Sequence, residues 1–249
     1  MYTLNKNQPR LIAIAISHYC EKVRWAMDYL DLNYVEEDHA PPFHRQYTSR
    51  HGGTTVPVLV TPEKAFTDSH DILQYLDSIS ESKLYPEAVR DRVEEWEKLF
   101  DEKLGVATRT YGYYYAMQQP LKVAIAWGIK APLIERIKAI FAFPKIPQIL
   151  QQFYSITPAA KDAALEEIQA IFAKVSQELD SGQKYLVGNS VTAADLTFAA
   201  LSSPVLRPPN HPVYDLRLSK LTPERIATIE ELRATPAGQL AMNMYREHR

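Results

Sequence analysis

The hydrophobic pattern of this chain changes once, near residue 80, and the change limits the folds open to it. Before Ser80, apolar runs of strand length alternate with helical stretches; after it, apolar residues recur every three or four positions and strand signals vanish. Strands that alternate with helices build a sheet with helices packed on it, whereas a continuous 3.6-residue period builds a helical bundle. We therefore expect an α+β domain over residues 1–80, a linker at 81–87 and an all-α helical bundle over 88–249.

The elements expected in the first domain follow the order βαβ and then ββα. A helix with an apolar stripe follows the first strand, and a second helix begins at Asp68 and Ser69. This order predicts a four-stranded mixed sheet with helices packed on it. The candidate strands are Leu11–Ile16, Tyr34–Val35, Val56–Val60 and Ala65–Thr67.

Ser17 stands at the joint between the first strand and the first helix, and Cys20 lies one turn into that helix. A serine at this position caps the helix by accepting a backbone N–H bond. The same joint concentrates unpaired N–H groups and the positive end of the helix dipole, which stabilise an anionic sulfur or carboxylate. Either residue can therefore serve a thiolate. The alternative is structural, because such a serine is most often only a cap and such a cysteine most often a small buried hydrophobe.

Two further features of the first domain have both structural and functional interpretations. Pro57 lies near the start of a β-branched run; proline cannot donate to a strand ladder, and the Val56–Pro57 bond can be cis where the chain turns sharply. Asp68 and Ser69 are ordinary helix-cap residues, and they also stand beside free N–H groups at a helix start.

The C-terminal half contains a central helix and an unusual insertion. Thr192 and Asp195 have the spacing of a capping box and precede a helix that is apolar on nearly every side, as expected at the centre of a bundle. Near 120–156 the chain is apolar, basic and broken by prolines. Such a stretch can lie on a membrane surface, line a hydrophobic pocket or pack in short helices; we favour packing. An aromatic cluster precedes it: Tyr111, Tyr113, Tyr114 and Tyr115.

Composition and spacing argue against several functional classes. The net charge of −2 and the lack of a dense Lys/Arg block do not indicate a surface that binds nucleic acid. No apolar run approaches the ~20 residues that span a bilayer, so we expect no integral membrane insertion. The polar start at residues 1–10 lacks the apolar core of a signal peptide, and a single cysteine fits a reducing compartment. We therefore expect a cytoplasmic protein. The seven histidines lack metal-ligand spacing, so we expect no metal.

Together these motifs resemble those of the serine-type cytosolic glutathione S-transferases (GSTs). Ser17-x-x-Cys20 is similar to the family's active-site turn, Val56-Pro57 to its cis-proline turn, Asp68-Ser69 to its γ-glutamyl-binding pair and Thr192-x-x-Asp195 to its central helix cap. The resemblance covers nearly the whole length. It implies a thioredoxin-like domain followed by a helical domain, glutathione as co-substrate, a homodimer and a role in detoxification.

The resemblance also implies roles for individual residues. Ser17 would stabilise the thiolate of glutathione while the tripeptide binds Thr55, Val56, Pro57, Asp68 and Ser69. The hydrophobic electrophile would lie between the Ser17 turn and the helical domain, with Tyr19, Tyr111, Tyr114 and Tyr115 as candidate pocket residues. The sequence departs from the family pattern in having His18 in place of proline, Thr54-Thr55 in place of a lysine, and Asp68 in place of Glu or Gln.

Two other functions remain open on these residues. One is a thiol-disulfide reductase that uses Cys20, since cysteine-type relatives carry a reactive cysteine in this turn. The other is a non-catalytic binding or scaffold protein of the same fold, suggested by the altered glutathione contacts and the long insertion.

Overall fold

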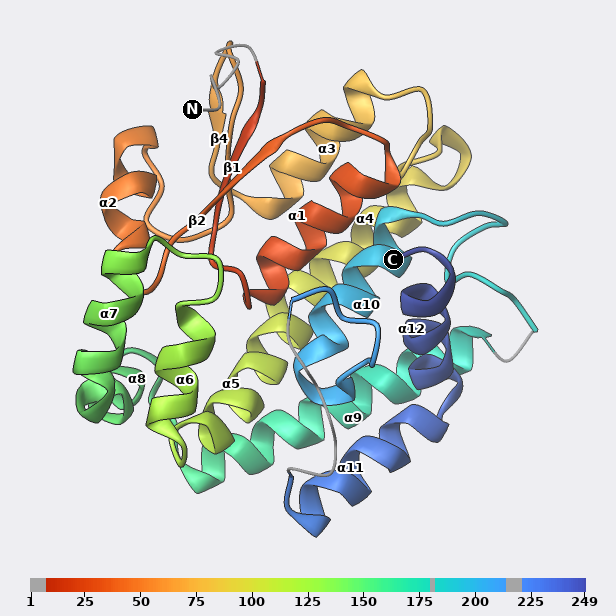
Figure 1. Cartoon of the computed structure of the whole chain (residues 1–249). Helices are drawn as coiled ribbons and strands as arrows, with labels where there is room; N and C mark the ends of the chain where they lie inside the picture. Colours follow the sequence, from red (N-terminus) through yellow and green to blue (C-terminus); the bar gives the residue numbers. More distant parts are fainter. Residues whose placement is uncertain (1–7, 180–181, 214–220) are drawn as a thin grey trace. The chain divides into compact units, whose positions relative to one another are not determined.

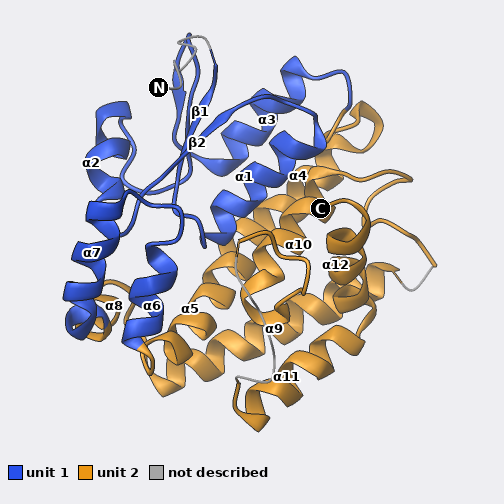
Figure 2. Ribbon diagram, in the orientation of Figure 1, with its two compact units in different colours: residues 1–82, 120–146 blue, residues 83–119, 147–249 orange. Residues whose placement is uncertain are grey.

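The computed structural model describes residues 8–179, 182–213 and 221–249. The contacts of the chain divide it into two units, which Figure 2 colours separately. The first unit combines residues 1–82 with 120–146, and the second combines 83–119 with 147–249. The chain thus leaves the first unit, returns to it and leaves again.

The first unit is built on a four-stranded mixed sheet of order β2-β1-β3-β4. β1 pairs in parallel with β2 and antiparallel with β3, and β3 pairs antiparallel with β4. The strands are β1 (Arg10–Ala13), β2 (Val35–Asp38), β3 (Val58–Val60) and β4 (Ala65–Phe66). The expected thioredoxin-like order of βαβ and ββα is therefore confirmed.

Helices cover both sides of this sheet, as Figure 1 shows. α1 (His18–Tyr29) and α3 (Ser69–Ile79) pack together on one side, and α2 (His44–Thr48) with the 3₁₀ turn η1 (Ser49–His51) lies on the other. Burial of aliphatic side chains from the central strands and from these helices drives the packing. The fully buried members include Leu11, Ile12, Leu59, Val23, Ile72 and Leu73.

β2 is longer than the sequence predicted. We expected the strand to end after Val35, at the acidic run, but Glu36, Glu37 and Asp38 all pair with β1. Cations on neighbouring elements make this possible: Arg10 binds Glu37 at 2.9 Å, and Arg24 binds Glu36. A partly buried carboxylate is tolerated when it is paired in this way, and residue charge alone does not show the pairing.

The insertion folds into short helices, and its first part packs with the sheet. The helices are α6 (Pro120–Trp127), α7 (Leu133–Ala142), the 3₁₀ turn η4 (Phe143–Lys145) and α8 (Ile146–Tyr154). Glu135 of α7 accepts a 2.9 Å bond from the backbone N–H of Ala40, just beyond β2, and Lys130 lies 3.0 Å from Glu36. Packing in short helices is therefore what the structure shows. The domain division at 81–87 stays a prediction, but residues 120–146 do not pack within the single helical block that we expected.

The second unit is helical, and α10 is its most deeply buried helix. Phe198 of α10 lies against Phe100 and Phe172, with ring centroids 5.1 and 5.2 Å away. A π-helical segment, η3, continues α4 directly into α5. The elements are η2 (Glu87–Val89), α4 (Arg90–Leu99), η3 (Phe100–Leu104), α5 (Gly105–Ala116), α9 (Pro158–Leu179), α10 (Ala193–Leu206), α11 (Pro223–Ala234) and α12 (Pro236–Glu247).

The predicted capping box at the start of α10 is present. Asp195 is fully buried and accepts the backbone N–H groups of Leu186, at 2.7 Å, and Thr192, at 2.9 Å. The hydroxyl of Thr192 also donates to it, at 2.8 Å. One carboxylate therefore fixes both the helix start and the loop before it.

Among the helices of the described residues, none combines the length and the apolar character needed to cross a bilayer. The polar start that suggested the absence of a signal peptide falls largely on residues 1–7, outside the described part of the chain.

Replacing Asp195 with alanine is expected to destabilise the protein by about 2–4 kcal/mol, because two buried N–H groups would lose their acceptor. Thr222→Ala, which removes the exposed cap of α11, is the matched control and is expected to cost about 1 kcal/mol or less. Urea unfolding of the two variants measures both values. Equal losses of unfolding free energy in the two variants would contradict the expectation that the buried carboxylate contributes more than the exposed cap.

Candidate functional site

The strand register brings the Ser17 turn and the Val56–Pro57 turn to the same end of the sheet. Ile12 lies opposite Val58 in an antiparallel pair. Moving forward along β1 toward Ser17 therefore corresponds to moving backward along β3 toward Pro57. The first turn follows β1 and the second precedes the neighbouring strand β3. The two turns, 40 residues apart in sequence, therefore lie at the same end of the sheet.

The register of the next strand pair places the start of α3 at the same end of the sheet. Leu59 lies opposite Phe66 in the antiparallel β3–β4 pair. Two residues beyond Phe66 is Asp68, and two residues before Leu59 is Pro57, so these two positions are level with each other. Three motifs on three adjacent strands thus converge at one end of the sheet, all within the first unit.

Ser17 caps α1 and keeps part of its side chain accessible. Its Oγ accepts the backbone N–H of Cys20 at 3.3 Å, and the residue is only partly buried. A hydroxyl has one hydrogen to donate and two lone pairs. Since the cap uses the oxygen as an acceptor, the hydroxyl hydrogen can be donated to an anion at the helix start.

Cys20 has the opposite character. Its side chain has no exposed surface, and burial raises the pKa of the thiol to about 11, an effect that the nearby Arg24 offsets only in part. The thiolate is the reactive form of cysteine, so a buried thiol with a raised pKa is poorly suited to thiol-disulfide exchange. Of the two residues, Ser17 is therefore the one that keeps accessible surface at the start of α1.

A buried arginine holds the backbone in front of Ser17. The Nη2 atom of Arg24 donates to the carbonyl oxygens of Ile14, at 3.1 Å, and Ala15, at 2.7 Å. The same guanidinium binds Glu21, at 2.7 Å, and Glu36. Bonds from a charged donor are among the stronger hydrogen bonds in proteins. Sequence reasoning missed this network: the i,i+3 spacing of Glu21 and Arg24 is visible, but their burial is not.

The turn before β3 contains the predicted cis bond. The Val56–Pro57 peptide is cis, and ladder pairing of β3 begins only at Val58, so the Val56 peptide lies outside the sheet. Thr55 is exposed and Val56 partly so. Gly53 packs so closely that an added Cβ would lie 2.9 Å from a methyl of Val58, which disfavours a larger residue at this position.

Asp68 and Ser69 begin α3 as expected. Asp68 is exposed, and its carboxylate accepts the backbone N–H of His70 at 2.8 Å. Ser69 is nearly buried, at 7% exposure. The helix start therefore presents one exposed carboxylate beside backbone N–H groups.

The four tyrosines that we expected in a substrate pocket fall into two groups. Tyr19 belongs to α1 in the first unit and is partly buried beside His18. Tyr111 and Tyr115 lie in α5 of the second unit and are packed against each other in its core, with 1% and 9% exposure. Tyr114 is partly exposed, and the Nζ of Lys161 lies 5.6 Å from its ring centroid. Tyr19 and Tyr114 retain accessible surface, whereas the other two are largely committed to packing.

The last residues of β2 lie at the same end of the sheet, and they include polar residues that the sequence analysis did not identify as site candidates. The two ring nitrogens of His39 lie 2.9 Å from Glu135 and 3.1 Å from Glu37. Burial alone would lower the pKa of His39, but these carboxylates outweigh it and hold the pKa above its usual value. Asp38 beside it is 7% exposed, and burial, with Glu36, raises its pKa to about 6. No spacing in the sequence reveals the contact between β2 and α7.

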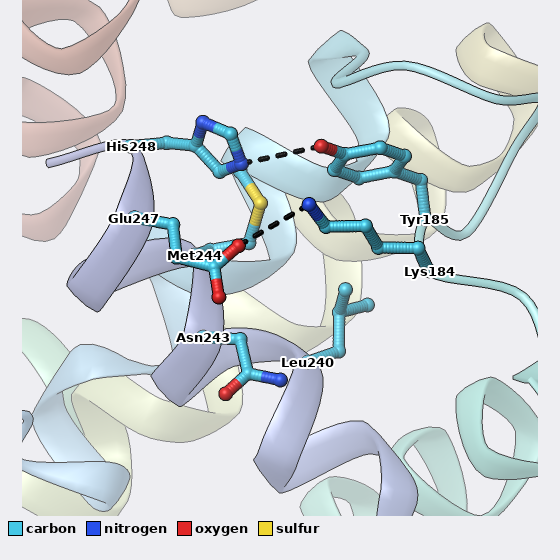
Figure 3. A pocket seen from close by; sticks show the side chains of 7 residues that line it. All are labelled: Lys184, Tyr185, Leu240, Asn243, Met244, Glu247 and His248. Atoms are coloured by element: carbon cyan, nitrogen blue, oxygen red, sulfur yellow. Dashed lines mark hydrogen bonds and ion pairs between the residues drawn. The ribbon is translucent and has the colours of Figure 1, made fainter.

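The second unit has a small pocket of its own, shown in Figure 3. Four of its polar side chains pair with one another: Lys184 lies 3.3 Å from Glu247, and Tyr185 lies 3.3 Å from His248. Its volume of about 20 Å³ holds roughly one water molecule. It carries none of the sequence motifs, so we do not assign it a function. Within the described residues, no cluster of His, Cys, Asp and Glu has the arrangement of a metal site.

Comparisons with known proteins agree with the fold described above. A family model for the glutathione S-transferase N-terminal domain matches residues 11–83, and one for the glutathione S-transferase C-terminal domain matches residues 133–211. A comparison with curated proteins found no significant match.

Several solved structures share the fold over nearly the whole chain. Glutathione transferase GSTFuA3 from Phanerochaete chrysosporium is 18% identical with a TM-score of 0.64, over 97% of each chain. The β-etherase LigF from Sphingobium sp. strain SYK-6 is 20% identical with a TM-score of 0.58, over 95% of this chain and 99% of that one. The theta class enzyme of Xanthomonas axonopodis pv. citri, solved with glutathione bound, is 19% identical with a TM-score of 0.54, over 95% and 97%.

The class of this protein is defined by a thioredoxin-like sheet, with a cis-proline turn at the same end as the start of α1, in a chain that continues as a helical bundle. Together with the two matching family models, these features show that the chain belongs to the glutathione S-transferase superfamily.

The pH dependence of stability is expected to change when Asp38 becomes asparagine. The pKa of Asp38 is about 6 in the folded state and about 3.9 when unfolded. Its protonated form therefore stabilises the fold below pH 4, and this stabilisation is lost as the pH rises through about 6. The free energy of unfolding of Asp38→Asn, measured relative to that of the parent, should therefore rise by on the order of 2 kcal/mol between pH 4 and pH 7.

Urea unfolding at a series of pH values measures this difference. Glu166→Gln is the control, since it removes a charge from an exposed position of α9. If the difference between Asp38→Asn and the parent stays constant with pH, the raised pKa is contradicted.

Proposed function

We propose that this protein is a glutathione transferase that joins the sulfur of reduced glutathione to a hydrophobic electrophile. The observation that carries the proposal is the convergence of Ser17, the cis Val56–Pro57 turn and Asp68 at one end of the sheet. Family membership supports transferase-type chemistry, and relatives of the same fold have been solved with glutathione bound.

The residues at this end of the sheet fit the parts of glutathione. The exposed Asp68 carboxylate and the adjacent Ser69 suit the charged γ-glutamyl end. The Val56 peptide, which lies outside the sheet ladder, can pair with the backbone of the cysteinyl part, with Thr55 and Pro57 flanking it. Ser17 then stands where the sulfur would lie, at the positive end of α1.

The chemistry asked of the protein is modest. A hydroxyl that donates to a thiolate favours the charged form and lowers the pKa of the thiol, which raises the fraction of the nucleophile near neutral pH. The thiolate attacks an electrophilic carbon, a C–S bond forms, and the leaving group departs with its electron pair. The partly buried Tyr19, two residues beyond Ser17, is the aromatic side chain that we assign to contact with an apolar substrate.

Replacing Ser17 with alanine is expected to lower kcat/KM for conjugation of an activated aryl halide about 10–100-fold, the loss of one hydrogen bond to a charged group. The pKa of bound glutathione, read from the thiolate absorbance, should rise. Ser17→Thr keeps the hydroxyl and should recover part of the activity.

Cys20→Ala is the matched control, because it changes a buried neighbour in the same turn without removing the hydroxyl. It should leave conjugation largely intact. Loss of activity in Cys20→Ala with activity retained in Ser17→Ala would instead support the reductase. No heat on calorimetric titration with millimolar glutathione would support the scaffold.

We further propose that the protein is a homodimer in the cytoplasm, as its resemblance to the family implies. Two-fold dimers are the commonest closed assemblies. Light scattering should give twice the chain mass of 28.4 kDa. A value equal to the chain mass at micromolar concentration would contradict the dimer without affecting the assignment of Ser17.

A further inference from the structure

The helices α6 and α7 expose an unusually apolar surface, which we call the apolar face. Phe141 is 82% exposed and Leu133 is 68% exposed, far more than such side chains usually are in a folded protein. All its members lie within the first unit: Leu121, Ile125, Leu133, Ile134, Ile137, Ile140 and Phe141.

The period of α7 places these residues on a single stripe. Successive helical residues are about 100° apart, so the five exposed apolar residues of α7 fall within an arc of roughly 120°. Glu135 and Ala139 lie on the opposite side, and both are buried against the first unit. The helix therefore uses its polar and small residues to pack inward and presents its large apolar residues outward.

Basic residues border this stripe. On the same helical period, Arg136 falls on one flank of the stripe and Lys138 on the other, and both are exposed. Residues 120–146 contain five basic residues and one acidic residue, in a chain whose net charge is −2. The single acid is Glu135, which is buried and bonded to His39 and Ala40. The exposed charges of this segment are therefore all positive.

An apolar stripe with basic flanks is the arrangement of helices that lie in the surface of a membrane, with aliphatic side chains among the acyl chains and basic groups at the phosphates. We propose that the apolar face docks this protein on an anionic lipid surface. A second copy of the chain fits less well, because a two-fold contact would place one basic border against another. The proposal does not depend on glutathione chemistry.

Vesicle sedimentation of the full-length protein tests the proposal. The protein should sediment with vesicles of phosphatidylcholine and phosphatidylserine, and less with phosphatidylcholine alone or at high salt. Phe141→Asp combined with Ile137→Asp should weaken binding at least tenfold. The matched control is Ile79→Asp, on α3 of the same unit, where the side chain is 53% exposed outside the apolar face; it should bind as the parent does.

A charge reversal and a reporter complete the test. Arg136→Glu with Lys138→Glu should abolish the preference for anionic vesicles while leaving weak binding to neutral ones. In Phe141→Trp, the new indole should shift its emission to the blue with anionic vesicles, since the native Trp25, Trp96 and Trp127 are buried.

Three results would overturn the proposal. The first is no binding of the parent to anionic vesicles. The second is equal binding to neutral and anionic vesicles. The third is a self-associated parent that Phe141→Asp converts to a smaller species, which would make the apolar face a contact between copies.

Discussion

The arrangement of the candidate site depends on one buried guanidinium. Arg24 donates to the carbonyl oxygens of Ile14 and Ala15, the residues that lead into Ser17, and is itself neutralised by Glu21 and Glu36. Without the carboxylates, the buried cation would be too costly; without the cation, two carbonyl groups and two carboxylates would lose this charged donor. The position of the Ser17 hydroxyl is therefore set by charges on α1 and β2, not by the cap alone.

The motifs at the ends of elements were predictable because their mechanisms are local. A serine at a strand–helix joint, a proline at a strand start and a capping box each act within a few residues, and all are present at Ser17, Pro57 and Asp195. The convergence of Ser17, Pro57 and Asp68 followed from the strand register, which the order of elements alone suggests but does not fix.

What the sequence did not reveal depends on contacts between distant residues. The acidic run of β2 looked like the end of a strand, because its neutralising partners come from other elements. No spacing in the sequence pointed to Glu135, which binds the chain beyond β2, 95 positions away. Helical periodicity identifies an apolar and a polar face of α7. It does not show that the face with Glu135 packs inward and that the aliphatic face is exposed to water.

The path of the chain has a consequence for how the protein is made. Because residues 120–146 belong to the first unit, that unit includes chain from both sides of residues 83–119, which belong to the second. A domain that is continuous in sequence can fold on the ribosome as soon as its last residue emerges, and N-terminal domains generally do. Here the N-terminal unit is complete only when α7 has emerged, so its β2 edge stays without Glu135 during synthesis of α4 and α5. A nascent chain stopped before residue 120 would hold His39 without its buried partner.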